Sequence, residues 1–242
     1  MSILFLNGSP KHITSASQYF LNLIRMQAVG SKTTQIKLQP KAYDEIFSQF
    51  NQIDALVISL PVYVDGVPSH VLRFMVEAER FIKENNCQFK LYVISNCGFY
   101  EGTQCKHVLS IMQSFCKASG LTWGGGLGIG AGEMLSAIRV VLISVILPVL
   151  ISVPTLLLMR QPFFGLWISS AITLSIFLIL SLRLFYATWR MQKAIRKGDT
   201  ISDFYTGLTL CHRFIFMIVS SMYFIVRAAF NGLGFIGIYK KG

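Results

Sequence analysis

The chain has 242 residues, which is enough for one domain with a large attachment or for two small domains. Hydrophobic residues make up 53% and charged residues 14%, which excludes intrinsic disorder and indicates a membrane protein or an unusually apolar one. The net charge of +11 would suit either a nucleic-acid partner or a membrane surface.

The charge is distributed unevenly along the chain. Residues 1–138 carry 11 Lys and Arg against 9 Asp and Glu, whereas residues 139–242 carry 11 against 2. The near balance of the first part argues against a nucleic-acid partner. The difference predicts a domain over residues 1–135 and a C-terminal membrane region over residues 136–242.

In the first part, short apolar runs alternate with amphipathic segments. Strands are expected at 3–6, 34–38, 55–60, 91–95 and 122–129, and helices from about residue 15 and near 41–50, 69–83 and 104–119. This alternation predicts an α/β fold with a doubly wound, five-stranded parallel sheet in a three-layer sandwich. A ligand site is then expected beyond the carboxyl ends of the strands.

The second part contains two long uncharged runs. Residues 140–159 form a run of 20 and residues 161–182 a run of 22, each long enough to cross a bilayer core of about 30 Å as a helix. We therefore predict an all-α transmembrane region with spans at about 140–159 and 162–182 and a third apolar segment at about 214–238. Two buried helices of a soluble protein are the alternative.

The orientation of the predicted spans follows from the basic residues after the second run. Lys and Arg are concentrated between residues 183 and 197, and such an excess marks the cytoplasmic side of a membrane protein. Two spans would place the N-terminal domain on the same side. The sequence thus predicts a multi-pass cell-membrane protein with a cytoplasmic N-terminal domain.

Three loops that follow predicted strands carry the candidate ligand-binding residues. The first, residues 8–17, offers hydroxyl and backbone N–H groups at the start of a helix, which suits a phosphate monoester. A simple helix cap by Thr14 or Ser15 is the alternative. The loops at 61–69 and 95–102 combine small residues with aromatic ones and could lie against a planar ligand. Three loops at neighbouring strand ends predict one site.

The loops also carry a family resemblance. N-G-S-P-K with Ser15-x-Ser17, then P-V-Y-V-D-G-V-P-S-H-V-L-R-F-M, N-C-G-F-Y-E-G and W-G-G-G-L-G-I-G-A-G-E-M, occur in this order. Together they resemble the flavodoxin-like NAD(P)H-dependent FMN reductase family over roughly residues 1–135. The resemblance implies noncovalently bound FMN and NADH or NADPH as the electron donor.

The resemblance also assigns residues to the parts of FMN. Ser9, Ser15 and Ser17 would hold the phosphate within a loop that includes Lys11 and Ala16; Pro61, Val62, Tyr63 and Val64 would line the isoalloxazine; and Asn96, Cys97, Gly98 and Phe99 would contact its pyrimidine side. Ala16 departs from related loops, which often place Thr or Asn there, and this leaves one phosphate hydrogen bond in question.

Flavin chemistry requires no catalytic acid, base or metal from the protein, because the ring itself accepts hydride at N5. The expected function is a membrane-anchored oxidoreductase that transfers electrons from NAD(P)H to a quinone, a flavin or another small or membrane-bound acceptor. The resemblance also suggests a homodimer. The alternatives are an FMN-binding electron-transfer module reduced by a protein partner, and a non-redox membrane scaffold with a relic flavodoxin-like domain.

Two further patterns in the sequence favour structural roles over chemical ones. Residues 126–131 fit G-x-G-x-x-A, but a dinucleotide fingerprint also needs an acidic residue about twenty positions later, and none lies between Glu133 and Asp199. The five cysteines show neither a C-x-x-C pair nor zinc spacing. Cys97 lies in the third loop, where packing is preferred over redox chemistry.

Overall fold

The computed structural model describes residues 1–11, 15–135, 164–208 and 213–230. The chain divides into two compact units. One, the α/β unit, consists of Met1–Glu133 and Arg183–Leu208, and the other consists of Met134–Leu182 and Thr209–Gly242. The α/β unit is therefore discontinuous, and it includes a segment that the sequence analysis assigned to the C-terminal region.

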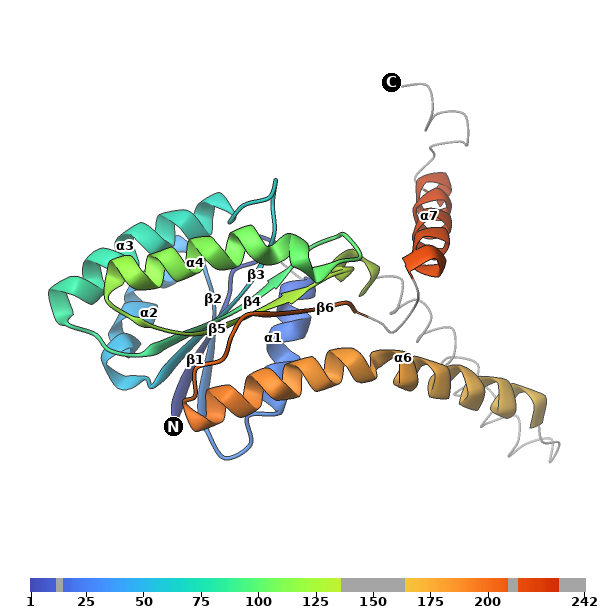
Figure 1. Ribbon diagram of the computed structural model, residues 1–242, viewed down its shortest axis with the longest axis horizontal. Helices are drawn as coiled ribbons and strands as arrows, with labels where there is room; N and C mark the ends of the chain where they lie inside the picture. The colour runs from blue at the N-terminus through green and yellow to red at the C-terminus, as the bar shows by residue number, and fades with distance from the viewer. Residues whose placement is uncertain (12–14, 136–163, 209–212, 231–242) are drawn as a thin grey trace, which may run out of the picture. The chain divides into compact units, whose positions relative to one another are not determined.

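The α/β unit is built on a parallel sheet with the strand order β2-β1-β3-β4-β5-β6 (Figure 1). The strands are β1 (Ser2–Asn7), β2 (Lys32–Lys37), β3 (Ala55–Pro61), β4 (Lys90–Asn96), β5 (Thr122–Ile129) and β6 (Phe204–Thr206). The order 2-1-3-4-5 defines a flavodoxin-like sheet, as predicted. The predicted number of strands was wrong, because β6 pairs in parallel with the far edge of β5.

Helices cover both faces of the sheet (Figure 1). One face carries α2 (Tyr43–Gln49), α3 (Ser69–Asn85) and α4 (Lys106–Ser119), and the other carries α1 (Ala16–Met26) and the second half of α6 (Phe164–Lys197). Short 3-10 helices lie at Pro40–Ala42, Phe50–Gln52, Gly102–Cys105 and Gly132–Met134. Successive strand residues point to opposite faces, so nearly continuous apolar strands can bury side chains against both helical layers.

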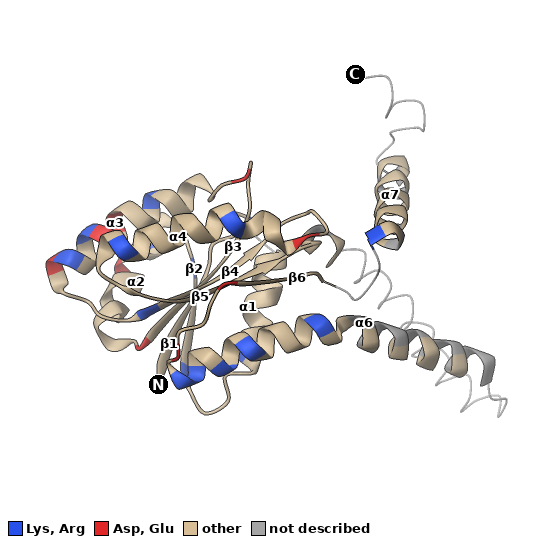
Figure 2. Ribbon diagram, viewed as in Figure 1, with Lys and Arg blue, Asp and Glu red and all other residues tan. Residues whose placement is uncertain are grey.

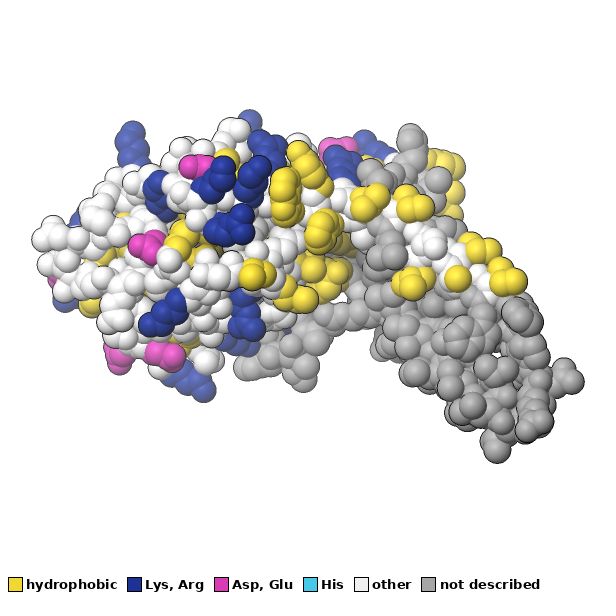
Figure 3. Space-filling model, turned by 90° about the horizontal axis from the view of Figure 1, so that it is seen from below, with side chains coloured by type: hydrophobic (Ala, Val, Ile, Leu, Met, Phe, Trp, Pro, Cys, Tyr) yellow, Lys and Arg dark blue, Asp and Glu magenta, His cyan; other side chains and the backbone are white. Residues whose placement is uncertain are grey.

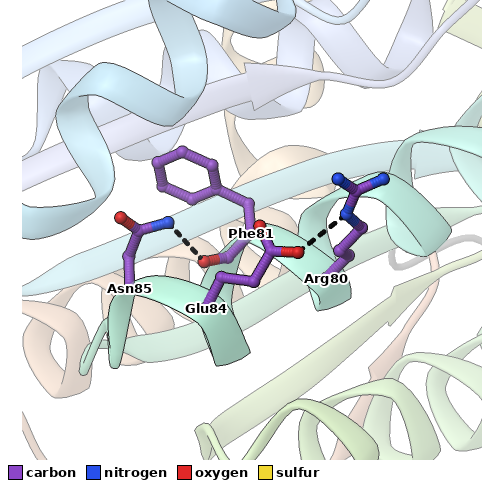
Figure 4. Close-up of polar contacts among 4 residues, drawn as sticks. All are labelled: Arg80, Phe81, Glu84 and Asn85. Carbon is purple, nitrogen blue, oxygen red and sulfur yellow. Dashed lines mark hydrogen bonds and ion pairs between the residues drawn. The ribbon is translucent and has the colours of Figure 1, made fainter.

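The exposed side of α3 shows how a surface helix is stabilised away from the sheet (Figure 4). Arg80 Nε lies 2.8 Å from Glu84 Oε1 one turn later, and Asn85 Nδ2 donates to the Phe81 carbonyl at 2.9 Å. The helix ends at Asn86, whose φ of 51° is the left-handed conformation typical of a helix C-terminus. These contacts lie on the surface, remote from the carboxyl ends of the strands.

The second half of α6 packs against the sheet through an apolar stripe. Leu184, Ala187, Met191 and Ile195 are all buried at helical spacing. Figure 2 shows Lys and Arg along the same part of the helix, and Figure 3 shows hydrophobic and basic side chains together on this face. Segment 183–197 is therefore an amphipathic helix that completes the α/β unit, and its basic side chains lie on the solvent-facing side.

The segment after α6 is held to the sheet by polar contacts. The buried Tyr92 donates its hydroxyl proton to the Asp199 carbonyl at 2.8 Å. Asp203 Oδ1 accepts from Gly126 N at 2.8 Å and from Trp123 Nε1 at 3.0 Å. These bonds position β6 beside β5.

The predicted membrane location is contradicted. No helix in the described parts of the chain is both long enough and apolar enough to cross a bilayer. The span predicted at 140–159 lies outside the described residues, whereas most of the one at 162–182 falls in α6, which continues into the amphipathic segment packed on the sheet. The third apolar segment, predicted at about 214–238, overlaps α7 (Arg213–Phe230), and its residues from 231 onward lie outside the described residues. The basic residues between 183 and 197 do not mark the flank of a membrane span. They lie on the exposed side of a helix whose apolar side packs against the sheet.

Candidate functional site

A shallow hollow lies at the carboxyl ends of β1, β3 and β4. It is lined by Ser9, Lys11, Ser15, Ala16, Ser17, Pro61, Val62, Tyr63, Asn96, Cys97 and Gly98. The three loops singled out in the sequence thus meet around one space. Val64 and Phe99, the remaining predicted site residues, are exposed on two of these loops and do not line the hollow.

Hydrogen bonds hold the described ends of the first loop, residues 8–11 and 15–17. Asn7, the last residue of β1, accepts a 3.0 Å hydrogen bond from Ser9 N and donates one of 2.7 Å to Gln18 Oε1. Ser15 caps α1, because its hydroxyl oxygen accepts from Gln18 N at 3.1 Å. Ser15 is therefore a helix cap, and it also lines the hollow.

A buried hydrogen-bond network connects the first and third loops. Ser17 Oγ donates to Asn96 Oδ1 at 2.7 Å, and Ser59 Oγ donates to the Ser17 carbonyl at 2.9 Å. All three residues are at most 6% exposed. The network joins the start of α1 to β3 and to the end of β4. Asn96 is thereby held in one orientation at the edge of the hollow.

Two basic side chains support the first loop from outside the hollow. Lys37 Nζ donates to the Lys11 carbonyl at 3.0 Å, and His70 Nε2 lies 3.0 Å from the Gly8 carbonyl. Burial lowers the pKa of His70, with a smaller contribution from the Lys37 charge, while the bond to Gly8 acts in the opposite direction. The neutral, donating form of His70 is therefore favoured near neutral pH.

The second loop contains a tight turn with an unusual backbone. Tyr63 and Gly66 exchange hydrogen bonds of 3.0 and 2.9 Å, and between them Val64 and Asp65 have φ angles of 47° and 57°. Left-handed backbone is rare for a β-branched residue, and such strain is found most often at ligand sites. The turn projects Val64 fully into solvent and leaves Tyr63 42% exposed beside the hollow.

The third loop is supported by the glycine-rich end of β5. Cys97 N donates to the Ile129 carbonyl at 3.0 Å, and Ala131 N donates to the Phe99 carbonyl at 2.5 Å. Gly130 approaches so closely that a Cβ atom there would lie 2.1 Å from the Tyr100 carbonyl oxygen. The G-x-G-x-x-A segment thus supports this loop.

Sequence reasoning missed several residues that organise the site. These are Asn7, Gln18, Lys37, Ser59 and His70. Of these five residues, only Ser59 could have been recognised in the sequence, because a serine within an otherwise apolar strand must find a buried hydrogen-bond partner. The other contacts depend on tertiary geometry.

No protein-family model and no curated protein matches the chain. Among solved structures, the Trp repressor binding protein from Bacillus subtilis is 16% identical, covering 53% of this chain and 83% of its own with a TM-score of 0.43. An azoreductase from Bacillus anthracis is 11% identical, with 56% and 89% coverage and a TM-score of 0.42. An FMN-dependent NADH-azoreductase from Bacillus anthracis, in complex with FMN, is 15% identical, with 50% and 83% coverage and a TM-score of 0.38. These similarities are distant, and the fold assignment rests on the strand order.

Proposed function

We propose that the α/β unit binds FMN noncovalently and is an oxidoreductase that passes electrons from NADH or NADPH to a small-molecule acceptor. The observation that carries the proposal is the position of the hollow. It lies at the carboxyl ends of β1 and β3, where the strand order reverses, and flavodoxin-like sheets bind FMN at this switch point. The resemblance of the three loops to FMN reductases supports the same ligand.

The donors of the first loop fit a phosphate monoester. A hydroxyl has one proton to donate and two positions that accept. Ser9 and Ser15 use their oxygens as acceptors for backbone N–H groups, so their protons can be directed to phosphate oxygens. Ser17 donates its proton to Asn96, so we assign it to positioning Asn96. The start of α1 would add its dipole and backbone N–H groups.

The other two loops fit a planar ring system. Pro61, Val62 and Tyr63 would lie along the ring, and Asn96 would present its amide group to the pyrimidine edge. When bound, the isoalloxazine ring supplies the redox chemistry by accepting hydride at N5. The protein's part is to hold the ring through these loops and to exclude water from the side that they cover.

The test is anaerobic FMN titration of the purified full chain, followed by addition of NADH or NADPH. We expect stoichiometric FMN binding and loss of the visible flavin absorption after the nicotinamide is added. Lys11→Glu places a negative charge at the hollow and should weaken FMN binding about tenfold or more. Lys41→Glu is the matched control, because Lys41 is also exposed but does not line the hollow.

The outcomes separate the proposal from its alternatives. Absence of FMN binding, or equal FMN affinity in the two variants, would contradict the assigned site. Stoichiometric FMN that neither NADH nor NADPH reduces would contradict the reductase activity. That result would favour an electron-transfer module that receives its electrons from a protein partner.

A further inference from the structure

A second hollow of the α/β unit lies where the end of α1 meets the second half of α6. It is lined by Gln27, Trp189, Gln192, Lys193 and Arg196. Gln27 is the C-cap of α1, and the four α6 residues are spaced as i, i+3, i+4 and i+7, which places them on one face of the helix. The start of α1 borders the hollow at the strand ends, so the two hollows lie near opposite ends of this helix.

Gln192 is buried at the wall of the second hollow with its amide group unpartnered. The residue is 3% exposed, and neither Nε2 nor Oε1 has a hydrogen-bond partner among the described residues. A buried amide without hydrogen bonds costs folding free energy, and an apolar side chain of similar size would fill the same space without that cost. The open amide therefore points to a ligand that completes its hydrogen bonds.

Gln27 adds a second open acceptor and is held in one orientation. Its Nε2 atom donates to Thr188 Oγ1 at 3.2 Å, and the Thr188 hydroxyl donates in turn to the Phe185 carbonyl at 3.0 Å. The Gln27 Oε1 atom is buried and has no partner in the described parts of the chain. The wall thus offers two acceptors, Gln27 Oε1 and Gln192 Oε1, and one amide donor, Gln192 Nε2.

The outer side of the second hollow is aromatic and positively charged. Trp189 is 43% exposed, and Lys193 and Arg196 are exposed on the same face of α6. Lys193 Nζ lies over the Trp189 ring, 5.0 Å from its centre, so the ammonium group is held beside the indole. None of the described residues that line the hollow is acidic. This side suits an aromatic ring that carries an anionic group.

We propose that the second hollow binds a nucleotide whose base carries an amino group next to a ring nitrogen, as adenine and cytosine do. The amino group has two N–H donors for Gln27 Oε1 and Gln192 Oε1, and the ring nitrogen accepts from Gln192 Nε2. Trp189 supplies an aromatic surface for the base, and Lys193 and Arg196 bind the phosphate. The partial negative charge at the end of α1 suits the amino group near Gln27.

The proposed nucleotide site is separate from the proposed flavin site. The 11 residues of α1 span about 16 Å, and each hollow borders one end of this length. The argument for the nucleotide uses only residues of α6 and the end of α1. It therefore does not rest on the proposed function.

The test is calorimetric titration of the purified full chain with adenosine monophosphate and with cytidine monophosphate. We expect one equivalent of at least one of them to bind, and the preferred nucleotide identifies the base. Inosine and uridine monophosphate carry a carbonyl oxygen in place of the amino group and should bind at least tenfold more weakly than their amino counterparts. The nucleoside without phosphate should also bind at least tenfold more weakly.

Two results of these titrations would overturn the proposal. One is the absence of binding of both amino nucleotides at millimolar concentration, which would mean that water alone completes the hydrogen bonds of Gln192. The other is equal affinity for a nucleotide and its carbonyl counterpart, which would show that the amide groups do not contact the base.

Variants assign the binding to the second hollow. Arg196→Glu and Gln192→Leu should each weaken nucleotide binding at least tenfold. Lys197→Glu is the matched control, because Lys197 is exposed on the same helix but does not line the hollow. Lys11→Glu, at the other hollow, should also leave nucleotide affinity unchanged. Weaker binding in Lys11→Glu but not in Arg196→Glu would overturn the proposal.

The two proposals of this article fail separately. Nucleotide binding that depends on Arg196, in a chain that binds no FMN, would support the second site and contradict the proposed function. FMN binding that depends on Lys11, in a chain that binds neither amino nucleotide, would support the proposed function and overturn the second site.

Discussion

Ser17 and Asn96 are 79 residues apart in the sequence, yet the Ser17 hydroxyl donates a 2.7 Å hydrogen bond to Asn96 Oδ1 in the buried wall of the hollow. One residue belongs to the first turn of α1 and the other ends β4. The bond thus connects the loop suited to a phosphate with the loop suited to a planar ring. It makes the geometry of the site depend on the relative position of two structural elements.

A double-mutant cycle should detect this bond as a coupling energy. We expect Ser17→Ala and Asn96→Ala each to lower the free energy of unfolding, and the double variant to lose about 1 kcal/mol less than the sum. Urea unfolding followed by circular dichroism measures all four proteins. Ser48→Ala, at an exposed serine, should change stability by less than about 0.5 kcal/mol. Strict additivity would show that the bond contributes nothing.

Gly102→Ala should destabilise the attachment of β6. A Cβ atom at Gly102 would lie 2.5 Å from both the Gly128 and the Thr206 carbonyl oxygens, and backbone atoms cannot move aside cheaply. We expect a loss of about 3 kcal/mol, at the upper end for overpacking. Gly66→Ala is the control, because its nearest neighbour would be 3.7 Å away. Equal melting temperatures for the two variants would contradict the packing described.

Asp203→Ala should also weaken the edge of the sheet. Its Oδ1 atom is the shared acceptor for Gly126 N and Trp123 Nε1, and a hydrogen bond to a charged acceptor contributes about 1.5–3 kcal/mol. We expect a loss of about 2 kcal/mol in urea unfolding. Asp203→Asn keeps an amide oxygen at this position and should lose less. If the two variants were equally destabilised, the acceptor role of Oδ1 would be wrong.

His70 should make stability depend on pH. Because its pKa is lowered in the folded protein, the unfolded chain takes up a proton at higher pH, near 6.5, and acid favours unfolding. Stability should therefore fall as the pH is lowered below about 6.5 and through the folded-state pKa. His70→Gln can still donate to the Gly8 carbonyl but does not titrate, so it should lack this part of the loss.

The control for His70 is His107→Gln, because His107 is exposed on α4. Urea midpoints measured between pH 7.5 and pH 5 should decline less steeply in His70→Gln than in the wild type and in His107→Gln. Parallel curves for all three proteins would show that the pKa of His70 is not lowered in the folded protein.

Most of the first five strands could be predicted because they are short apolar runs followed by a turn, whereas β2, with the sequence KTTQIK, is largely polar and partly exposed. The strand predicted at 122–129 coincides with β5, and the others differ by one or two residues at their ends. β6 could not be predicted in this way, because its three residues, Phe204–Thr206, are too few to show a period. It exists through tertiary contacts, above all those of Asp203.

The C-terminal half of α6 carries a sequence pattern that indicates a helix packed on a sheet. Leu184, Ala187, Met191 and Ile195 recur at helical spacing, which is typical of a helix packed on a sheet. The uncharged run before them and the basic residues among them together match a membrane span with a cytoplasmic flank, and this pattern led to the wrong prediction. The two halves differ in pattern, because residues 164–182 carry no charged side chain, whereas residues 183–197 combine buried apolar residues with exposed basic ones at helical spacing.

The loops of the candidate site were predictable because strand order brings their ends to one edge. The roles of single residues were not. Ser17 was expected to face a phosphate, but its proton goes to Asn96, and such a choice between two acceptors depends on distances that no local pattern contains. The contacts of His70 and Lys37 with the first loop are likewise products of folding.

The interruption of the α/β unit between Glu133 and Arg183 affects the order in which it can fold during synthesis. The first five strands leave the ribosome without the helix that covers one side of their sheet and without the sixth strand. Buried surface around Tyr92 stays open to water until Leu208 has emerged. The nascent chain therefore has to keep an incomplete sheet from pairing with other chains while the intervening segment is made, and a fragment cut at residue 135 would remain permanently in that state.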